Sequence, residues 1–336
     1  MSERRAVREM IHGCLATQLI YVAAELGLAD LLAQGPRTGE DLARAVGAEP
    51  GALYRVLRAL ESIGIFAEND DGRFAMTARG AVLQKDAEGS LHGVALLWGE
   101  VFWQPFGDLL HSVKTGQTAI EKQRGMGFYD HLERDPRAAE IFVTGIAGLS
   151  ELRGHEVAAV YDFSGVQKLV DVGGGNGSFL AAILQAYPHL LGVVLELPEV
   201  ARRAREHVAG LPGGSRCQVV AGDFFDAVPR GADAYIVKGV IHNWEDERAV
   251  AILGNCRRAM SDDGTLLLVE RVVAPGRQGR LAKFKDITML AITGGVERTA
   301  AELVSLLDAA GFSLVRELPL DLDMAILVAR PVHAGR

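Results

Sequence analysis

The sequence predicts an α/β protein in which a doubly wound, mostly parallel sheet follows a mainly helical, winged-helix-like N-terminal domain. From Val166 onward, short apolar runs alternate with helical segments, as in parallel sheets whose strands are joined by crossover helices. The first apolar run ends in a glycine-rich bend, "LVDVGGGNGS" at 169–178, at the edge where such sheets bind ligands. Residues 37–77 show a helix–turn–helix–hairpin pattern, which indicates the N-terminal domain.

The N-terminal domain is expected over residues 1–95. Apolar residues between 18 and 35 recur with the period of an amphipathic helix. Thr38 is placed to cap a short helix, and a second helix is expected to end at Ser62. The stretch that follows, "IFAENDDGRFAMT", predicts a hairpin that turns at 70–72.

The rest of the chain divides into a helical segment over 96–160 and a sheet domain over 161–332. In the sheet domain, each predicted strand is a short apolar run that a helical segment or a turn follows. These strands are predicted at 168–172, 191–196, 216–221, 233–239, 264–270, 313–318 and 324–330.

Charge and composition exclude several classes of function. The 336-residue chain has a formal net charge of −8, which disfavours binding to nucleic acid or to an anionic membrane. Residues 1–80 hold more acidic than basic side chains, so a DNA-reading regulator is the weaker interpretation of the helix–turn–helix pattern. No apolar run reaches the ~20 residues that span a bilayer, and no apolar signal segment follows the charged start. We therefore expect a cytoplasmic protein without nucleic-acid or membrane partners.

The glycine-rich bend has two candidate cofactors. The nicotinamide dinucleotide fingerprint requires Gly-x-Gly-x-x-Gly, whereas Ser178 stands where the last glycine of the series from Gly173 and Gly175 is needed. Asp171 lies two residues before the bend, where a carboxylate repels a pyrophosphate but suits an ammonium or sulfonium group. S-adenosylmethionine carries both cations and is the favoured cofactor. A tight turn without a ligand is the alternative.

Carboxylates also follow the next two predicted strands. Glu196 stands at the end of its strand, where it can accept hydrogen bonds from both hydroxyls of an adenosine ribose. Asp223 and Phe224 follow the next strand and can hold the adenine by its amino edge and its face. The alternatives are a solvated strand end for Glu196 and a core position for Phe224. Three successive strands thus carry an acidic group at or near their ends.

Six motifs, in order, resemble one enzyme family. They are "LVDVGGGNGS", "VVLELPEV", "AGDFFDAVP", "KGVIHNWEDE", "LLLVERVVAP" and "TGGVERT". The chain resembles the S-adenosylmethionine-dependent O-methyltransferases of the caffeate and hydroxyindole type, which include bacterial antibiotic-tailoring enzymes. The resemblance implies a Rossmann-like class I methyltransferase sheet and an N-terminal dimerisation domain. It also implies methylation of a hydroxyl, phenolic in the typical case, on a planar aromatic metabolite. The apolar period of residues 10–34 agrees with a homodimer built through this domain.

The resemblance assigns the catalytic residues. His242 matches the general base of the family, and Glu270 and Glu297 match the two acids that hold its imidazole. A phenol with a pKa near 10 is a poor nucleophile at neutral pH, and histidine, with a pKa of about 6.5, can take its proton. The alternatives are a structural role for His242 and a salt bridge between Glu297 and Arg298. No metal is required by this chemistry.

The resemblance also implies further cofactor and substrate contacts. Lys238 matches a family lysine near the cofactor, and Gly173, Gly174 and Gly175 form the cofactor loop. Asn243 departs from the commoner aspartate of the family, and the loss of that charge is expected to alter the pKa of His242 while leaving the base in place. Substrate contacts are expected from the helical segment and from a later helix, where core packing is the alternative: Met126, Phe142, Asp286 and Met289.

Some relatives of the family have turned from methyl transfer to decarboxylation or hydroxylation, typically after losing the catalytic histidine. His242 is retained, which favours methyl transfer over these activities.

Overall fold

A computed structural model of the chain describes residues 3–87 and 89–332. The chain forms two compact units. The first contains the residues up to Gln104 together with Leu132–Leu149, and the second contains Pro105–His131 together with the residues from Ser150 onward. The segment predicted over 96–160 is therefore shared between the two units.

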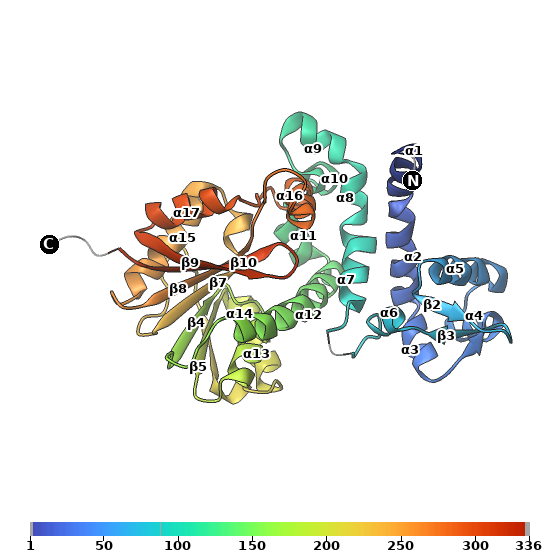
Figure 1. The fold of residues 1–336 in the computed structure, drawn as a ribbon, viewed down its shortest axis with the longest axis horizontal. Helices are drawn as coiled ribbons and strands as arrows, with labels where there is room; N and C mark the ends of the chain where they lie inside the picture. Colours follow the sequence, from blue (N-terminus) through green and yellow to red (C-terminus); the bar gives the residue numbers. More distant parts are fainter. Residues whose placement is uncertain (1–2, 88, 333–336) are drawn as a thin grey trace. The chain divides into compact units, whose positions relative to one another are not determined.

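The first unit is mainly helical (Figure 1). Its helices are α1 (Glu3–Ile11), α2 (Gly13–Glu25), α3 (Leu28–Ala33), α4 (Gly39–Val46), α5 (Pro50–Ser62), α6 (Ala78–Ala81) and α7 (His92–Leu96), which continues into a π-helix (Leu97–Val101). Its small antiparallel sheet has the order β1 (Arg37–Thr38), β3 (Arg73–Met76) and β2 (Phe66–Glu68).

The local predictions for this unit are confirmed. The Thr38 hydroxyl accepts a hydrogen bond from the Asp41 amide at 3.1 Å and so caps α4, because the first amides of a helix have no partner within it. Helix α5 ends at Ser62, and β2 and β3 form the predicted hairpin. Gly72 adopts a positive φ of 74° in the turn.

The second unit is built on a seven-stranded sheet of order β6-β5-β4-β7-β8-β10-β9. Its strands are β4 (Lys168–Val172), β5 (Leu191–Glu196), β6 (Cys217–Ala221), β7 (Ala234–Lys238), β8 (Thr265–Arg271), β9 (Phe312–Leu320) and β10 (Met324–Pro331). The first five are parallel, and β10 pairs antiparallel with both β8 and β9. All seven predicted strands are present, with ends that differ from the prediction by at most two residues, and the doubly wound sheet is confirmed.

Helices cover both faces of this sheet (Figure 1). Apolar residues of α15 (Asp246–Ala259) and α17 (Ala300–Ala309) pack on one face. Apolar residues of α13 (Ser178–Ala186) pack on the other face, together with the C-terminal end of α12 (Pro136–Val160). Because both faces are buried, the central strands are continuously apolar, which explains why they could be recognised as short apolar runs.

Helix α14 (Pro198–Ala209) joins β5 to β6 and packs against both strands. The remaining helices precede β4 or follow β8: α8 (Trp103–Gly107), α9 (Leu109–Thr115), α10 (Ala119–Arg124), α11 (Phe128–Arg134) and α16 (Arg280–Ile292). Helices α9 and α10 pack against α16. None of the described helices combines the length and the apolar composition that a membrane crossing requires.

Candidate active site

The glycine-rich bend follows β4 and has two physical requirements. Gly173, Gly175 and Gly177 adopt positive φ angles of 71°, 60° and 83°, which residues other than glycine rarely adopt. Gly174 is needed for space, since a Cβ atom there would lie 2.5 Å from Oδ2 of Asp171. The bend therefore brings bare backbone against the carboxylate at the end of β4.

Asp171 is a buried carboxylate with an unused oxygen. Its side chain is almost completely covered, and Oδ2 makes no hydrogen bond to any described residue. Burial raises the pKa of Asp171 to about 7, although the charge of Lys238 opposes the rise. A buried acceptor without a partner is costly, so the site fits a ligand that supplies a cationic donor.

Glu196, at the end of β5, is fixed by the bend itself. Its Oε1 accepts a hydrogen bond from the Gly175 amide at 2.9 Å, and its Oε2 accepts one from the Leu197 amide at 2.9 Å. Burial raises its pKa, and these two amides oppose the rise. Each carboxylate oxygen has a second lone pair, so Glu196 can still accept hydrogen bonds from a ligand.

Asp223 and Phe224 lie beyond the end of β6. Asp223 Oδ1 accepts a hydrogen bond from the Phe225 amide at 2.8 Å. The Phe224 ring packs on Phe225 and borders the glycine-rich bend, since its nearest carbon would lie 3.4 Å from a Cβ atom on Gly173. The ring thus contacts both the core and the bend.

Lys238, the last residue of β7, lies between acidic groups. Its Nζ donates a hydrogen bond to Ser150 Oγ at 3.3 Å and lies 5.2 Å from the centre of the Phe179 ring. Burial lowers the pKa of Lys238, while Asp171 and Glu270 act to raise it. The lysine therefore links the candidate cofactor site to the histidine cluster electrostatically.

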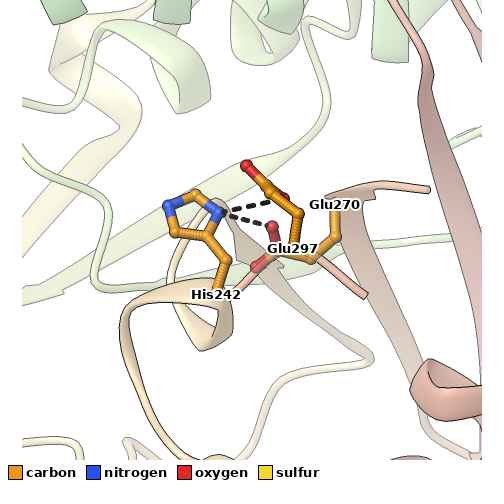
Figure 2. Close-up of side chains that lie close together, drawn as sticks. All are labelled: His242, Glu270 and Glu297. Atoms are coloured by element: carbon orange, nitrogen blue, oxygen red, sulfur yellow. Dashed lines mark hydrogen bonds and ion pairs between the residues drawn. The ribbon is translucent and has the colours of Figure 1, made fainter. Parts of the chain in front are cut away.

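His242 lies on a three-residue 3-10 turn (Ile241–Asn243) after β7. Its Nδ1 is 2.9 Å from Oε2 of Glu270, the penultimate residue of β8, and 3.9 Å from Oε2 of Glu297. Figure 2 shows both carboxylates on the Nδ1 side of the ring and Nε2 on the opposite side. The structure thus brings the three predicted catalytic residues into one cluster.

The two carboxylates differ in their surroundings. Oε1 of Glu270 accepts hydrogen bonds from the amides of Val240 and Ile241 at 3.1 and 3.0 Å. Oε2 of Glu297 makes no hydrogen bond to a described residue, and burial raises the pKa of Glu297 to about 7. For His242, burial acts to lower the pKa, but the charges of Glu270 and Glu297 outweigh it, so the pKa is raised.

The same three residues offer metal-ligand atoms that lie within 4.8 Å of one another: His242, Glu270 and Glu297. Both oxygens of Glu270 already accept hydrogen bonds, one from backbone amides and one from the imidazole. This arrangement favours an imidazole held by acids over a metal centre, because Nδ1 of His242 would have to give up its hydrogen bond to Glu270 to bind a metal.

The predicted substrate residues are dispersed. Asp286, on α16, lies next to the cluster, because its Oδ1 accepts a hydrogen bond from the Glu297 amide at 2.9 Å. Met289 accepts a hydrogen bond from Thr293, the residue after α16, and the Asn243 side chain donates to the Val240 carbonyl. Met126 lines a separate surface pocket beside α10. Phe142 belongs to the first unit, so its substrate contact stays a prediction.

Arg298 is a residue whose position the sequence did not reveal. A salt bridge to Glu297 is the alternative that the sequence offers, but the guanidinium instead pairs with Asp246 at 2.8 Å and binds backbone carbonyls beside His242. Arg271 lies near Glu297, with Nε 4.0 Å from Oε1. Alternation along an extended backbone was the only available signal, because it directs neighbouring side chains to opposite sides.

The seven-stranded sheet, with its glycine-rich bend and acidic strand ends, defines a class I methyltransferase fold. Residues 106–313 match the model of the O-methyltransferase domain, and residues 8–86 match the O-methyltransferase dimerisation domain. The chain belongs to this O-methyltransferase family, and its cofactor is S-adenosylmethionine.

Named relatives span almost the whole chain. The phenazine O-methyltransferase PhzM of Lysobacter antibioticus is 41% identical over 324 residues, which cover 96% of this chain and 95% of the relative. The crystal structure of LaPhzM has a TM-score of 0.93 at 40% identity and covers 99% of this chain and 100% of that chain. The O-methyltransferase NcsB1, solved with S-adenosylmethionine and 2-hydroxy-5-methyl naphthoic acid, has a TM-score of 0.77 at 34% identity, covering 94% and 96%.

Proposed function

We propose that this O-methyltransferase transfers the methyl group of S-adenosylmethionine to a phenolic hydroxyl of a planar aromatic metabolite, with His242 as the general base. The hydrogen bond between His242 Nδ1 and Glu270 carries the proposal, because it leaves Nε2 as the basic nitrogen. Relatives that act on phenazine or bind a naphthoic acid support a planar aromatic acceptor.

The cofactor would supply a methyl group already activated by its sulfonium. We assign its ammonium group to Asp171, whose buried Oδ2 lacks a partner among the described residues. Glu196 would accept hydrogen bonds from the ribose hydroxyls while the Gly175 amide holds it in place. Asp223 and Phe224 would hold the adenine. In this assignment, Gly173, Gly174 and Gly175 form the backbone wall, and Lys238 balances the nearby acids.

His242 would remove the phenolic proton as the oxygen attacks the methyl group. Proton transfer of this kind contributes about 10²–10⁴-fold to a rate. The proton would go to Nε2, and the imidazolium that forms would be stabilised by Glu270 through a hydrogen bond and by Glu297 through its charge. The carboxylates therefore orient the ring and raise its proton affinity together.

The acceptor would lie on the Nε2 side of His242. We propose that α16 contributes Asp286 and Met289 to its surroundings, since the Asp286 carboxylate already contacts the Glu297 backbone. Met126 and Phe142 remain proposed apolar contacts, because flexible thioethers and aromatic rings suit a planar ligand. Asn243, whose amide returns to the turn of its own backbone, is proposed to border the acceptor.

A homodimer through the N-terminal domain is the proposed assembly. The family model for dimerisation covers residues 8–86, and apolar side chains are exposed along α1 and the start of α2: Val7, Met10, Ile11 and Leu15. We infer that these side chains are buried against a second copy, and that the helix–turn–helix pattern serves packing and not DNA. Light scattering at micromolar concentration tests this inference, and a monomer would contradict it.

A screen of planar phenols, hydroxyphenazines and hydroxynaphthoates tests the activity. Each acceptor is incubated with the protein and S-adenosylmethionine, and mass spectrometry follows the methylated product and S-adenosylhomocysteine. We expect equal amounts of both products with at least one acceptor class. A product that has lost carboxyl carbon or gained oxygen, without a methyl group, would instead indicate a decarboxylase or hydroxylase. The variant His242→Ala serves as the control for background methylation.

A further inference from the structure

We propose that Arg298 is a positioning residue for the base, because its guanidinium binds backbone carbonyls of the turn that carries His242. The Arg298 side chain is 4% exposed. Its Nη1 donates to the Ile241 carbonyl at 3.1 Å, and its Nη2 donates to the Trp244 carbonyl at 2.7 Å. One guanidinium thus binds the backbone on both sides of His242. This proposal rests on the proposed role of His242.

The turn needs such support because it is short. Residues 241–243 form a single 3-10 turn, which has little stability of its own. On the amide side, Glu270 accepts hydrogen bonds from Val240 and Ile241. On the carbonyl side, the Val296 amide donates to the His242 carbonyl at 2.8 Å, and Arg298 binds the carbonyls on either side. The histidine is therefore held from two directions by two different segments.

The segment that contains Arg298 lies directly against this turn. A Cβ atom on Gly295 would come within 2.1 Å of the His242 carbonyl oxygen, so only glycine permits this approach. Arg298 itself is anchored to the chain after β8, because its carbonyl accepts a hydrogen bond from the Val273 amide at 2.9 Å. The segment 295–298 therefore connects the turn of His242 with the chain after Glu270, and it also carries Glu297.

Glu297 and Arg298 act on the same histidine from one backbone. Glu297 faces the imidazole, and Arg298, the next residue, faces the carbonyls of its turn. Asp246 compensates the buried guanidinium, with Oδ1 at 2.9 Å from Nε, and 76% of its own side chain is exposed. Loss of Arg298 would leave the Ile241 carbonyl with only the Trp244 amide, at 3.1 Å, and would remove the guanidinium from the Trp244 carbonyl, so the turn would be free to move. A displacement of about 1 Å in a catalytic group can reduce a rate by about 10²-fold.

The first experiment compares Arg298→Met and Arg298→Lys with the wild type. Arg298→Met is expected to keep S-adenosylhomocysteine affinity while kcat falls by about 10- to 100-fold, because the cofactor site is untouched. The acid limb of the kcat profile should shift to lower pH, since His242 would lose its close contact with Glu270. Arg298→Lys should recover part of kcat, because an ammonium can reach one carbonyl only.

Arg257→Met is the matched control. Arg257 pairs with Asp262 at 2.9 Å at the end of α15, in the same unit and away from the cluster. This variant loses an arginine ion pair of similar length, so its kcat and pH profile should match the wild type.

A double-mutant cycle separates positioning from general stability. If Arg298 acts through His242, adding Arg298→Met to His242→Ala should leave kcat unchanged relative to His242→Ala alone. Independent losses that multiply would overturn the proposal, as would a folded Arg298→Met with wild-type kcat and pH profile. If His242→Ala alone keeps wild-type turnover, the proposed function fails instead.

A milder variant keeps the test decisive if Arg298→Met does not fold. Asp246→Ala removes an exposed side chain and leaves the guanidinium without its charged partner. A smaller loss of kcat, with a shift of the acid limb in the same direction, is expected. Wild-type kcat and pH profile in Asp246→Ala would then overturn the proposal.

Discussion

Glu270 holds His242 in two ways, through its imidazole and through the backbone of the two preceding residues. One oxygen lies 2.9 Å from Nδ1, and the other accepts hydrogen bonds from the amides of Val240 and Ile241. Glu297, at 3.9 Å from the same Nδ1, is too far for a hydrogen bond and acts through its charge. The two acids therefore make different contributions to the same imidazole.

This difference predicts an order for two conservative variants. Glu270→Gln should reduce kcat by up to about 10²-fold. Both oxygens of Glu270 accept from N–H groups, so the NH₂ group of the new glutamine must face another donor, either a backbone amide or the imidazole N–H. Glu297→Gln should cost less, since it removes only charge. Both carboxylates raise the pKa of His242, so each variant should lower that pKa and move the acid limb of the kcat profile to lower pH. A larger loss in Glu297→Gln would contradict this division.

Cofactor binding should depend on pH through Asp171. Its pKa is raised to about 7 by burial, so the carboxyl is largely protonated below that pH in the free protein. A ligand ammonium favours the charged form, so binding should release a proton and the affinity for S-adenosylhomocysteine should fall as the pH drops below about 7.

Calorimetry in buffers of different ionisation enthalpy would measure that proton release. Asp171→Asn should bind more weakly than the wild type and lose the pH dependence. A wild-type affinity that stays constant across neutral pH would show that Asp171 does not contact the ammonium group.

Glu196 provides a second test of the cofactor site. Glu196→Ala removes the proposed ribose acceptor and the partner of the Gly175 amide, so S-adenosylhomocysteine affinity should fall by about 1–3 kcal/mol. Glu199→Gln is the matched control, because Glu199 is an exposed acid that pairs with Arg202 on the following helix. Equal affinities of both variants for S-adenosylhomocysteine in calorimetry would remove Glu196 from the site.

Much of the sheet domain could be predicted because its determinants are local. The apolar runs of β4 and β5 are bounded by turn residues, and strands of a sheet with two buried faces need no more than that. The glycine-rich bend could also be predicted, since positive φ angles and close backbone approach both require glycine. The π-helix Leu97–Val101 was not predicted, because it depends on packing and not on a local sequence pattern.

The candidate site was predictable in its members but not in its connections. His242, Glu270 and Glu297 come from three segments that only the fold brings together. No local pattern shows that Glu196 binds the Gly175 amide or that Arg298 binds the Ile241 carbonyl. Such contacts depend on the register between distant segments, and a single sequence does not encode that register in a readable form.

Activity should survive removal of divalent metal ions. His242 and the two glutamates offer ligand atoms within 4.8 Å, but Nδ1 of His242 is already engaged with Glu270 at 2.9 Å. Methyl transfer from a sulfonium needs no Lewis acid, so EDTA should leave kcat unchanged, and added Zn²⁺ should inhibit by occupying the base. Loss of activity in EDTA that Mg²⁺ restores would show instead that the cluster is a metal centre.

The effect of Asn243 on the base can be tested by one substitution. Asn243 directly follows His242, and its amide donates a hydrogen bond to the Val240 carbonyl at 3.4 Å. Asn243→Asp adds a negative charge beside the imidazole, so the pKa of His242 should rise and the acid limb of kcat should move to higher pH. Asn243→Ser, which adds no charge, is the control. An acid limb that does not move would show that residue 243 is too well screened to tune the base.

The decisive variant is His242→Ala. If His242 removes the acceptor proton, kcat should fall by about 10²–10⁴-fold while S-adenosylhomocysteine affinity is retained, because the cofactor residues lie on other segments. Higher pH should partly restore the rate, since a phenol ionises unaided near pH 10 and then needs no base. The wild type should level off once His242 is deprotonated, so the two pH profiles should converge at alkaline pH. Near-wild-type turnover of the variant at neutral pH would mean that the histidine is structural, or that the acceptor is acidic enough to ionise without it.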